Sequence, residues 1–258
     1  MTLTHTLTLL LLGHVLGDFY FQWDNMATKK KENWKWLVGH GVVYALCMAG
    51  VMFTGIKYSS DLLVLTITVC ALHILIDKLK VRIEKDSEWT RIKKRIFILD
   101  QLIHLVFICV AYLSFGRGLQ VNDIVGYIEQ RFSLFPFPPL VVLLGVLIIL
   151  RPVGLLIKYG EIWDFTKKKT PSTDQEGAGK MIGYLERIIV FFLLLHNQFG
   201  AIAFVIAAKS VIRFPEINKA NSSDNQNALA EYYLIGTLLS MTSVFIVSLL
   251  LGLIKTGA

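Results

Sequence analysis

Apolar stretches close to the length of a bilayer-spanning helix recur along almost the whole sequence. Of its 258 residues, 54% are hydrophobic, and the mean hydropathy is +0.57. A helix needs about 20 predominantly apolar residues to cross the hydrocarbon core of a membrane. We therefore predict an all-α fold, a polytopic transmembrane helical bundle, with eight spans near residues 3–24, 36–56, 60–78, 96–115, 139–158, 180–196, 199–214 and 231–254.

The organisation of these spans has one open point. The stretch at 199–214 is short and carries Lys209, so it also fits a re-entrant half-helix, which would leave seven spans. Proline and glycine mark a linker in KKKTPSTDQEGAGK. We expect a four-helix bundle over residues 1–116 and a second helical bundle over 117–258, with this cytoplasmic linker near 159–180.

Basic residues determine the expected orientation. Lysine and arginine cluster in alternate loops, at residues 29–35, 78–95 and 158–180. The positive-inside rule assigns these loops to the cytoplasm, which places both termini outside the cytoplasmic membrane. The net charge of +7 therefore predicts contact with anionic membrane lipids. Nucleic-acid binding is not predicted, because the basic loops lack an aromatic-interleaved RNA-binding signature.

Histidine and aspartate interrupt the first four apolar stretches. A charged side chain at the centre of a membrane helix costs about 2.5 to 3.5 kcal/mol on insertion scales, so such residues need partners and are functional-site candidates by default. The residues concerned are His14, Asp18, His40, His73, Asp77, Asp100 and His104.

Spacing and depth both predict that these seven residues meet. His14/Asp18, His73/Asp77 and Asp100/His104 are each four residues apart, so each pair occupies one helical face. With the predicted orientation, all seven fall in the cytoplasmic half of the bundle, most of them about 5 to 16 Å from the inner boundary. Small residues favour close helix packing beside them, at Gly13, Gly17, Gly39 and Gly41.

Imidazole and carboxylate groups together are typical ligands of a divalent metal, zinc first, with iron or manganese as alternatives. Two further interpretations stay open: hydrogen bonds that hold the helices together, and a proton or ion relay.

Cys47, Cys70 and Cys109 stand singly in apolar stretches and predict neither a disulfide framework nor a thiolate site. The sequence contains no G-x-S-x-G or complete P-loop motif, so it predicts neither a serine hydrolase of that type nor ATP-driven chemistry.

Several of these stretches resemble a known family. GHVLGDFYFQ, HILID and DQLIH, followed by GYLERIIVFFLLL, AIAFVIAAKSVIRFPE and AEYYLIGTLLS, are similar to bacterial integral membrane proteins grouped as domain of unknown function 3307. The N-terminal motifs cover roughly the first 115 residues. The resemblance implies a membrane-embedded helical protein, and it implies no activity because the family is uncharacterised.

The second half of the chain offers a separate polar group. Arg187, Lys209 and Arg213 lie in or beside apolar stretches and are candidates for holding a lipid phosphate. The alternative is that these residues fix helix packing through ion pairs or reach the membrane surface from a helix end.

The leading hypothesis is a metal-dependent hydrolase that acts on a lipid or lipid-linked substrate near the cytoplasmic leaflet. We expect His14, His73 and His104 as the first metal ligands, with the remaining cluster residues completing one or two metal shells. Asp18, Asp77 and Asp100 are the candidate catalytic groups, since an aspartate without metal can act as a general base. The alternatives are a transporter or channel coupled to protons or a divalent cation, and a non-catalytic membrane scaffold.

Overall fold

The structure is a computed structural model that describes residues 2–84, 93–132, 137–159, 176–218 and 223–256. These residues form helices joined by turns, and the β-structure found among them is one isolated bridge between Ile56 and Val121. The predicted all-α class is confirmed. The chain divides into two compact units, residues 1–144 with 254–258, and residues 145–253.

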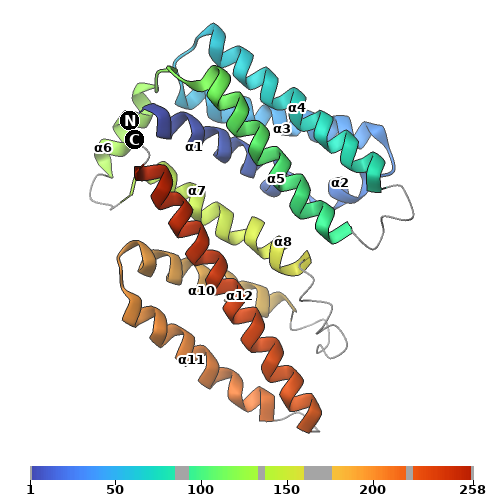
Figure 1. The fold of residues 1–258 in the computed structure, drawn as a ribbon, viewed down its shortest axis with the longest axis vertical. Coiled ribbons are helices and arrows are strands. Elements are labelled where there is room, and N and C mark those ends of the chain that lie inside the picture. Colours follow the sequence, from blue (N-terminus) through green and yellow to red (C-terminus); the bar gives the residue numbers. More distant parts are fainter. Residues whose placement is uncertain (1, 85–92, 133–136, 160–175, 219–222, 257–258) are drawn as a thin grey trace. The chain divides into compact units, whose positions relative to one another are not determined.

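The first unit is a four-helix bundle with short additional elements. Helix α1 packs against α3, α3 against α4 and α4 against α5, and α5 returns to α1 (Figure 1). The chain order is α1 (Thr2–Val15), the π-helical turn η1 (Leu16–Tyr20), α2 (Asp24–Lys29), α3 (Trp34–Gly55), α4 (Ser60–Glu84), α5 (Lys93–Ala111), the π-helical turn η3 (Tyr112–Gly116) and α6 (Asp123–Arg131).

Capping side chains set where the helices of this unit begin. The Asn33 side chain accepts a hydrogen bond from Lys35 N (2.9 Å) at the start of α3, and Ser59 Oγ accepts one from Leu62 N (3.2 Å) at the start of α4. At the far end of α3, Lys57 N donates to Gln120 O (2.7 Å). The turn between α3 and α4 is thereby joined to the segment that precedes α6.

Glycine permits close approach of α1 and α3. A Cβ atom at Gly17 would lie 2.8 Å from Tyr44 Cδ2 and 3.2 Å from Tyr44 Cα, and one at Gly13 would lie 2.7 Å from Met48 Sδ. These contacts are the small-residue packing expected from the sequence. At Gly39 a Cβ would meet nothing within 4 Å, so the expectation of a close contact is wrong at that position.

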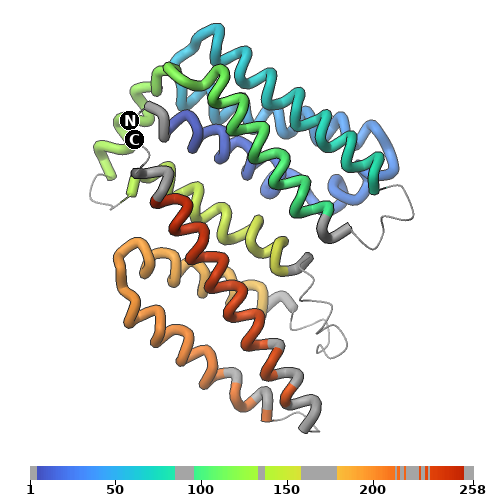
Figure 2. Tube along the Cα trace, in the orientation of Figure 1, coloured from blue at the N-terminus to red at the C-terminus, as the bar shows by residue number. Residues whose placement is uncertain are grey.

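The second unit begins within α7 (Pro139–Leu150) and continues through α8 (Pro152–Tyr159), α10 (Glu176–Leu195), α11 (Phe199–Asn218) and α12 (Ser223–Thr256). Figure 2 follows this order along the chain. Helix α7 ends just before Pro152, which has no backbone N–H to continue the ladder of hydrogen bonds. Helices α10 and α11 pack together across a turn in which Asn197 has a left-handed backbone (φ 56°).

Five stretches in the described part of the chain are long and apolar enough to cross a membrane: Trp34–Gly55, Ser60–Glu84, Ile96–Gly116, Pro139–Ile157 and Tyr233–Gly252. The predicted total of eight spans is not confirmed. Helix α1 has only 14 residues before its π-turn, and the apolar part of α11 is the shorter Phe199–Ile212. Most of the predicted linker near 159–180 lies outside the described residues.

Candidate functional site

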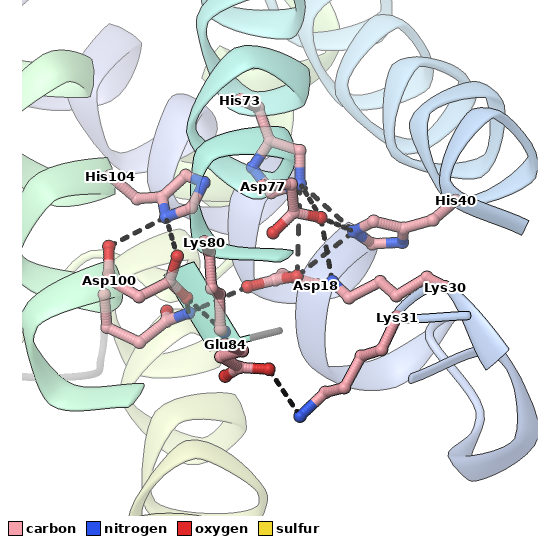
Figure 3. A network of polar contacts seen from close by, with 11 residues as sticks. Asp18, Lys30, Lys31, His40, His73, Asp77, Lys80, Glu84, Asp100 and His104 are labelled. Carbon is pink, nitrogen blue, oxygen red and sulfur yellow. Dashed lines mark hydrogen bonds and ion pairs between the residues drawn. The ribbon is translucent and has the colours of Figure 1, made fainter. Parts of the chain in front are cut away.

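The seven histidine and aspartate residues singled out in the sequence lie together inside the first unit. Each is buried, with exposed fractions between 1% and 9%. They come from four neighbouring elements: α1 with its π-turn, α3, α4 and α5. Figure 3 shows how most of these side chains converge. The set is His14, Asp18, His40, His73, Asp77, Asp100 and His104.

His40 makes the closest side-chain to side-chain contacts among these seven residues. Its Nε2 lies 3.1 Å from His73 Nε2, 3.3 Å from Asp18 Oδ1 and 3.3 Å from Asp77 Oδ2. His73 Nε2 lies 4.0 Å from the same Asp18 oxygen and 3.9 Å from the same Asp77 oxygen. Two imidazole nitrogens and two carboxylate oxygens therefore face one small volume.

These separations can be compared with those in a zinc site. Zinc–nitrogen and zinc–oxygen bonds of about 2.0 to 2.2 Å in a tetrahedron place neighbouring ligand atoms about 3.3 Å apart. The three contacts of His40 Nε2 match that spacing, and the two longer contacts of His73 exceed it by about 0.6 to 0.7 Å. Two sets of three potential ligand atoms lie within 4.8 Å of one another: Asp18, His40 and His73, and His73, Asp77 and His104.

Two lysines pair with the buried carboxylates. Lys30, which follows α2, places Nζ 2.8 Å from Asp77 Oδ2, and both side chains are buried. Lys80 on α4 places Nζ 2.7 Å from Asp100 Oδ2. In the sequence both lysines belong to the basic clusters that predict the orientation, and neither is predicted to reach the site. The available signal for Lys80 was its position three residues after Asp77, on nearly the same helical face.

Glutamine side chains connect the carboxylates. Gln101 Nε2 donates to Asp18 Oδ2 (3.0 Å) and to Asp100 Oδ2 (3.1 Å). With its amide nitrogen turned toward Asp18, Gln22 donates to Asp18 Oδ1 at 3.2 Å and its oxygen accepts from Lys30 Nζ at 2.7 Å. Asp18 itself lies in η1, and π-helical turns occur frequently at functional sites.

Tyr44 supports two of the histidines and was missed in the sequence. Its ring stacks on His73 with centroids 3.6 Å apart and an angle of 3°, and its hydroxyl lies 3.2 Å from His14 Nδ1. Tyr44 is fully buried. Its position four residues after His40 was a usable signal, because residues i and i+4 share a helical face. His14 thus borders the cluster through Tyr44 and through its ring contact with His104.

His104 and Asp100 present buried polar atoms toward the same interior. His104 Nδ1 lies 2.8 Å from the Asp100 carbonyl oxygen, which only accepts, so Nδ1 carries the proton and Nε2 has a free lone pair. Among the described residues, His104 Nε2 and Asp100 Oδ1 have no hydrogen-bond partner. A cavity of about 10 Å³ is lined in part by His73 and His104. That volume is close to the minimum needed for one water molecule.

The polar residues of the second unit are arranged differently. Arg187 is buried, donates from Nε to the Ile149 carbonyl oxygen (2.7 Å) and lies over the Tyr184 ring. Lys209 forms an ion pair with Glu186. The side chain of Arg213 lies outside the described set. Arg187 therefore holds the end of α7, and Lys209 joins α11 to α10.

Comparison with known proteins finds one family model that matches the N-terminal part of the chain. Residues 6–130 match the sequence model of a family described as Protein of unknown function (DUF3307). This range includes all seven cluster residues and both lysines. The resemblance inferred from the motifs is confirmed over these residues. No curated protein and no solved structure matches the chain.

Proposed function

We propose that the buried cluster within residues 6–130, the stretch that matches the DUF3307 model, binds a divalent metal, zinc first, in a hydrolase for a lipid or lipid-linked substrate. The observation that carries this proposal is the spacing of ligand atoms around His40 Nε2, at 3.1 to 3.3 Å from three potential ligands. Iron and manganese also accept imidazole and carboxylate ligands and are the alternatives to zinc.

Asp18, His40 and His73 are the proposed ligands. A catalytic zinc site holds three protein ligands and leaves a fourth position for water, whereas a fourth protein ligand closes the site. Asp77 Oδ2 also lies 3.3 Å from His40 Nε2, but the Lys30 ammonium group pairs with that oxygen at 2.8 Å. We therefore assign Asp77 as a neighbour of the metal, which would leave the fourth coordination position to water.

Asp77 is the proposed general base. A divalent metal acidifies its bound water so that hydroxide forms near neutral pH. Asp77 Oδ2 lies 3.3 Å from His40 Nε2, so it would be close enough to accept a proton from water on a metal that His40 holds. His104 and Asp100 adjoin this group through the ring contact of His104 with His73, and Lys80 and Gln101 hold Asp100 in place.

The packing of the bundle supports hydrolysis over transport. A transporter needs a polar route to both sides of the membrane. Between the cluster and the Ile56–Val121 bridge, the described core is largely filled by apolar side chains that are fully or almost fully buried, among them Leu10, Met48, Met52, Leu62 and Leu65. This apolar packing separates the cluster from the far end of the bundle.

The basic loops support a location in the cytoplasmic membrane with both termini outside. Positions 35 and 57 test this orientation, because Lys35 and Lys57 are exposed near opposite ends of α3. In a variant lacking the three native cysteines, Lys57→Cys should react with an impermeant thiol reagent in intact cells. Lys35→Cys should react only after the cells are opened, and the reverse pattern would contradict the proposed orientation.

The hydrolase proposal predicts a specific result for Asp77→Asn. Asparagine keeps an oxygen for Lys30, so metal affinity should fall by no more than about 10- to 100-fold. Loss of the general base should lower turnover by about 10² to 10⁴. The assay incubates purified protein with a total membrane lipid extract and measures products by mass spectrometry, with chelation and metal restoration as controls. The mechanism would be contradicted if Asp77→Asn retains wild-type turnover, or if chelation leaves turnover unchanged.

A further inference from the structure

The charges around the cluster indicate the class of substrate. Asp18, Asp77 and Asp100 contribute three negative charges, and Lys30 and Lys80 contribute two positive charges. With neutral histidines, the described groups of the cluster leave one uncompensated negative charge. A divalent metal reverses this balance and leaves one uncompensated positive charge in a buried site.

An uncompensated buried charge is costly, so the loaded site favours a ligand that carries one negative charge. Transfer of a water proton to Asp77 moves charge within the site and leaves its total unchanged. A neutral ester or amide would leave the positive charge uncompensated. A phosphodiester, or a phosphomonoester with one proton, carries the matching charge.

The two lysines have the chemistry to hold such a ligand. Lysine binds phosphate as a point charge, and each ammonium group has three N–H donors. Asp77 and the Gln22 oxygen accept two donors of Lys30, and Asp100 accepts one from Lys80. Within the described part of the chain, each ammonium group therefore retains at least one donor. Figure 3 shows the two lysines reaching the carboxylates from different elements.

We propose that the metal-loaded cluster binds a phosphate ester, with Lys30 and Lys80 contacting the phosphate oxygens. This inference rests on the proposed metal-dependent hydrolase and specifies its substrate class. In the reaction, the oxygen of water bonds to phosphorus while the P–O bond to the lipid alcohol breaks. Asp77 accepts one proton of that water, and the departing alcohol oxygen receives a proton from Lys80.

The test measures phosphate binding to the full chain loaded with manganese, whose paramagnetism broadens the ³¹P resonance of bound phosphate. Inorganic phosphate should bind to the loaded wild-type protein and not to the metal-free protein, and acetate should bind more weakly. Dihexanoyl phosphatidic acid should displace the phosphate, whereas dihexanoylglycerol should not. If dihexanoyl phosphatidic acid fails to displace inorganic phosphate, the site binds free phosphate only. That result would overturn the proposal that the substrate is a lipid phosphate ester.

Substitutions of Lys80 test the phosphate-ester inference separately from the proposed metal site. Lys80→Met should weaken phosphate binding at least tenfold without loss of manganese, whereas Lys80→Arg should retain it because the positive charge remains. Lys57→Met, near the other end of the bundle, is the matched control and should bind like wild type. The phosphate-ester inference alone would be overturned if Lys80→Met binds phosphate with unchanged affinity, or if the manganese-loaded wild-type protein does not bind phosphate. Protein that binds no manganese would overturn the metal proposal as well.

Discussion

Replacing His73 with alanine should abolish metal binding or weaken it by orders of magnitude. Of the proposed ligands, His73 belongs to both sets of potential metal-binding atoms, and a three-ligand site rarely keeps its metal on two. His40→Ala should have the same effect, because His40 Nε2 makes the closest side-chain to side-chain contacts among the seven cluster residues. The measurement is the metal content of purified variants together with zinc titration by calorimetry.

His14 and His196 are matched histidine controls for this prediction. His14 contacts Tyr44 and His104 and lies outside both sets of potential ligand atoms, so His14→Ala should retain the metal. His196 is exposed in the turn between α10 and α11, and its replacement should change nothing. Loss of metal from His14→Ala with retention in His40→Ala would show that the ligands are those expected from the sequence alone.

Replacing Lys30 with alanine should destabilise the metal-free protein by about 3 to 5 kcal/mol. The ion pair with Asp77 is buried on both sides, with side-chain exposed fractions of 6% and 2%. Removing the lysine leaves an uncompensated carboxylate in the bundle interior, which costs more than the pair itself contributes. Unfolding in detergent by denaturant measures the loss of free energy.

Two further variants distinguish a buried charge from a general loss of packing. Lys30→Ala combined with Asp77→Ala removes both charges and should recover much of the lost stability. Lys57 pairs with Asp123 at the surface, where the side chains are 48% and 88% exposed, so Lys57→Ala should change the free energy of unfolding by about 0 to 1 kcal/mol. A Lys30→Ala protein as stable as Lys57→Ala would contradict the proposed role of the buried pair.

The location of the cluster was predictable because two independent patterns agree on it. Helical periodicity places His73 and Asp77 on one helical face, and it does the same for Asp100 and His104. The orientation predicted from the basic loops places the polar residues of all four helices at a similar depth in the membrane. Both patterns depend only on residue type and position. The structure accordingly brings together the seven residues that the sequence singled out.

The division of roles within the cluster was not predictable in the same way. Lys30 and Lys80 look like ordinary loop cations in the sequence, because their long side chains can reach either water or the bundle interior. The spacing of Tyr44 from His40 places both residues on one helical face, but it does not predict that the Tyr44 ring stacks on His73. Asp77 forms an ion pair with Lys30, whereas Asp18 contacts His40 and accepts a hydrogen bond from Gln101. This difference between the two carboxylates depends on side-chain distances, which the sequence does not contain.

The number of spans was harder to predict than the meeting of the seven polar residues. Hydropathy marks apolar stretches, whereas α10 and α11 combine such stretches with charged residues that pair inside their own unit, as Glu186 does with Lys209. Helix α1 also ends in a π-turn after 14 residues. Apolar composition alone does not distinguish a complete crossing from a shorter helix packed against its neighbours.

The most direct test is elemental analysis of detergent-purified wild-type protein before and after chelation. We expect about one equivalent of zinc, iron or manganese per chain, its loss on chelation, and its recovery when the metal is returned. His40→Ala, treated identically, should contain none. Wild-type protein that holds no stoichiometric metal even after incubation with these ions, and whose unfolding is unchanged by chelators, would contradict the metal centre and the hydrolase that depends on it.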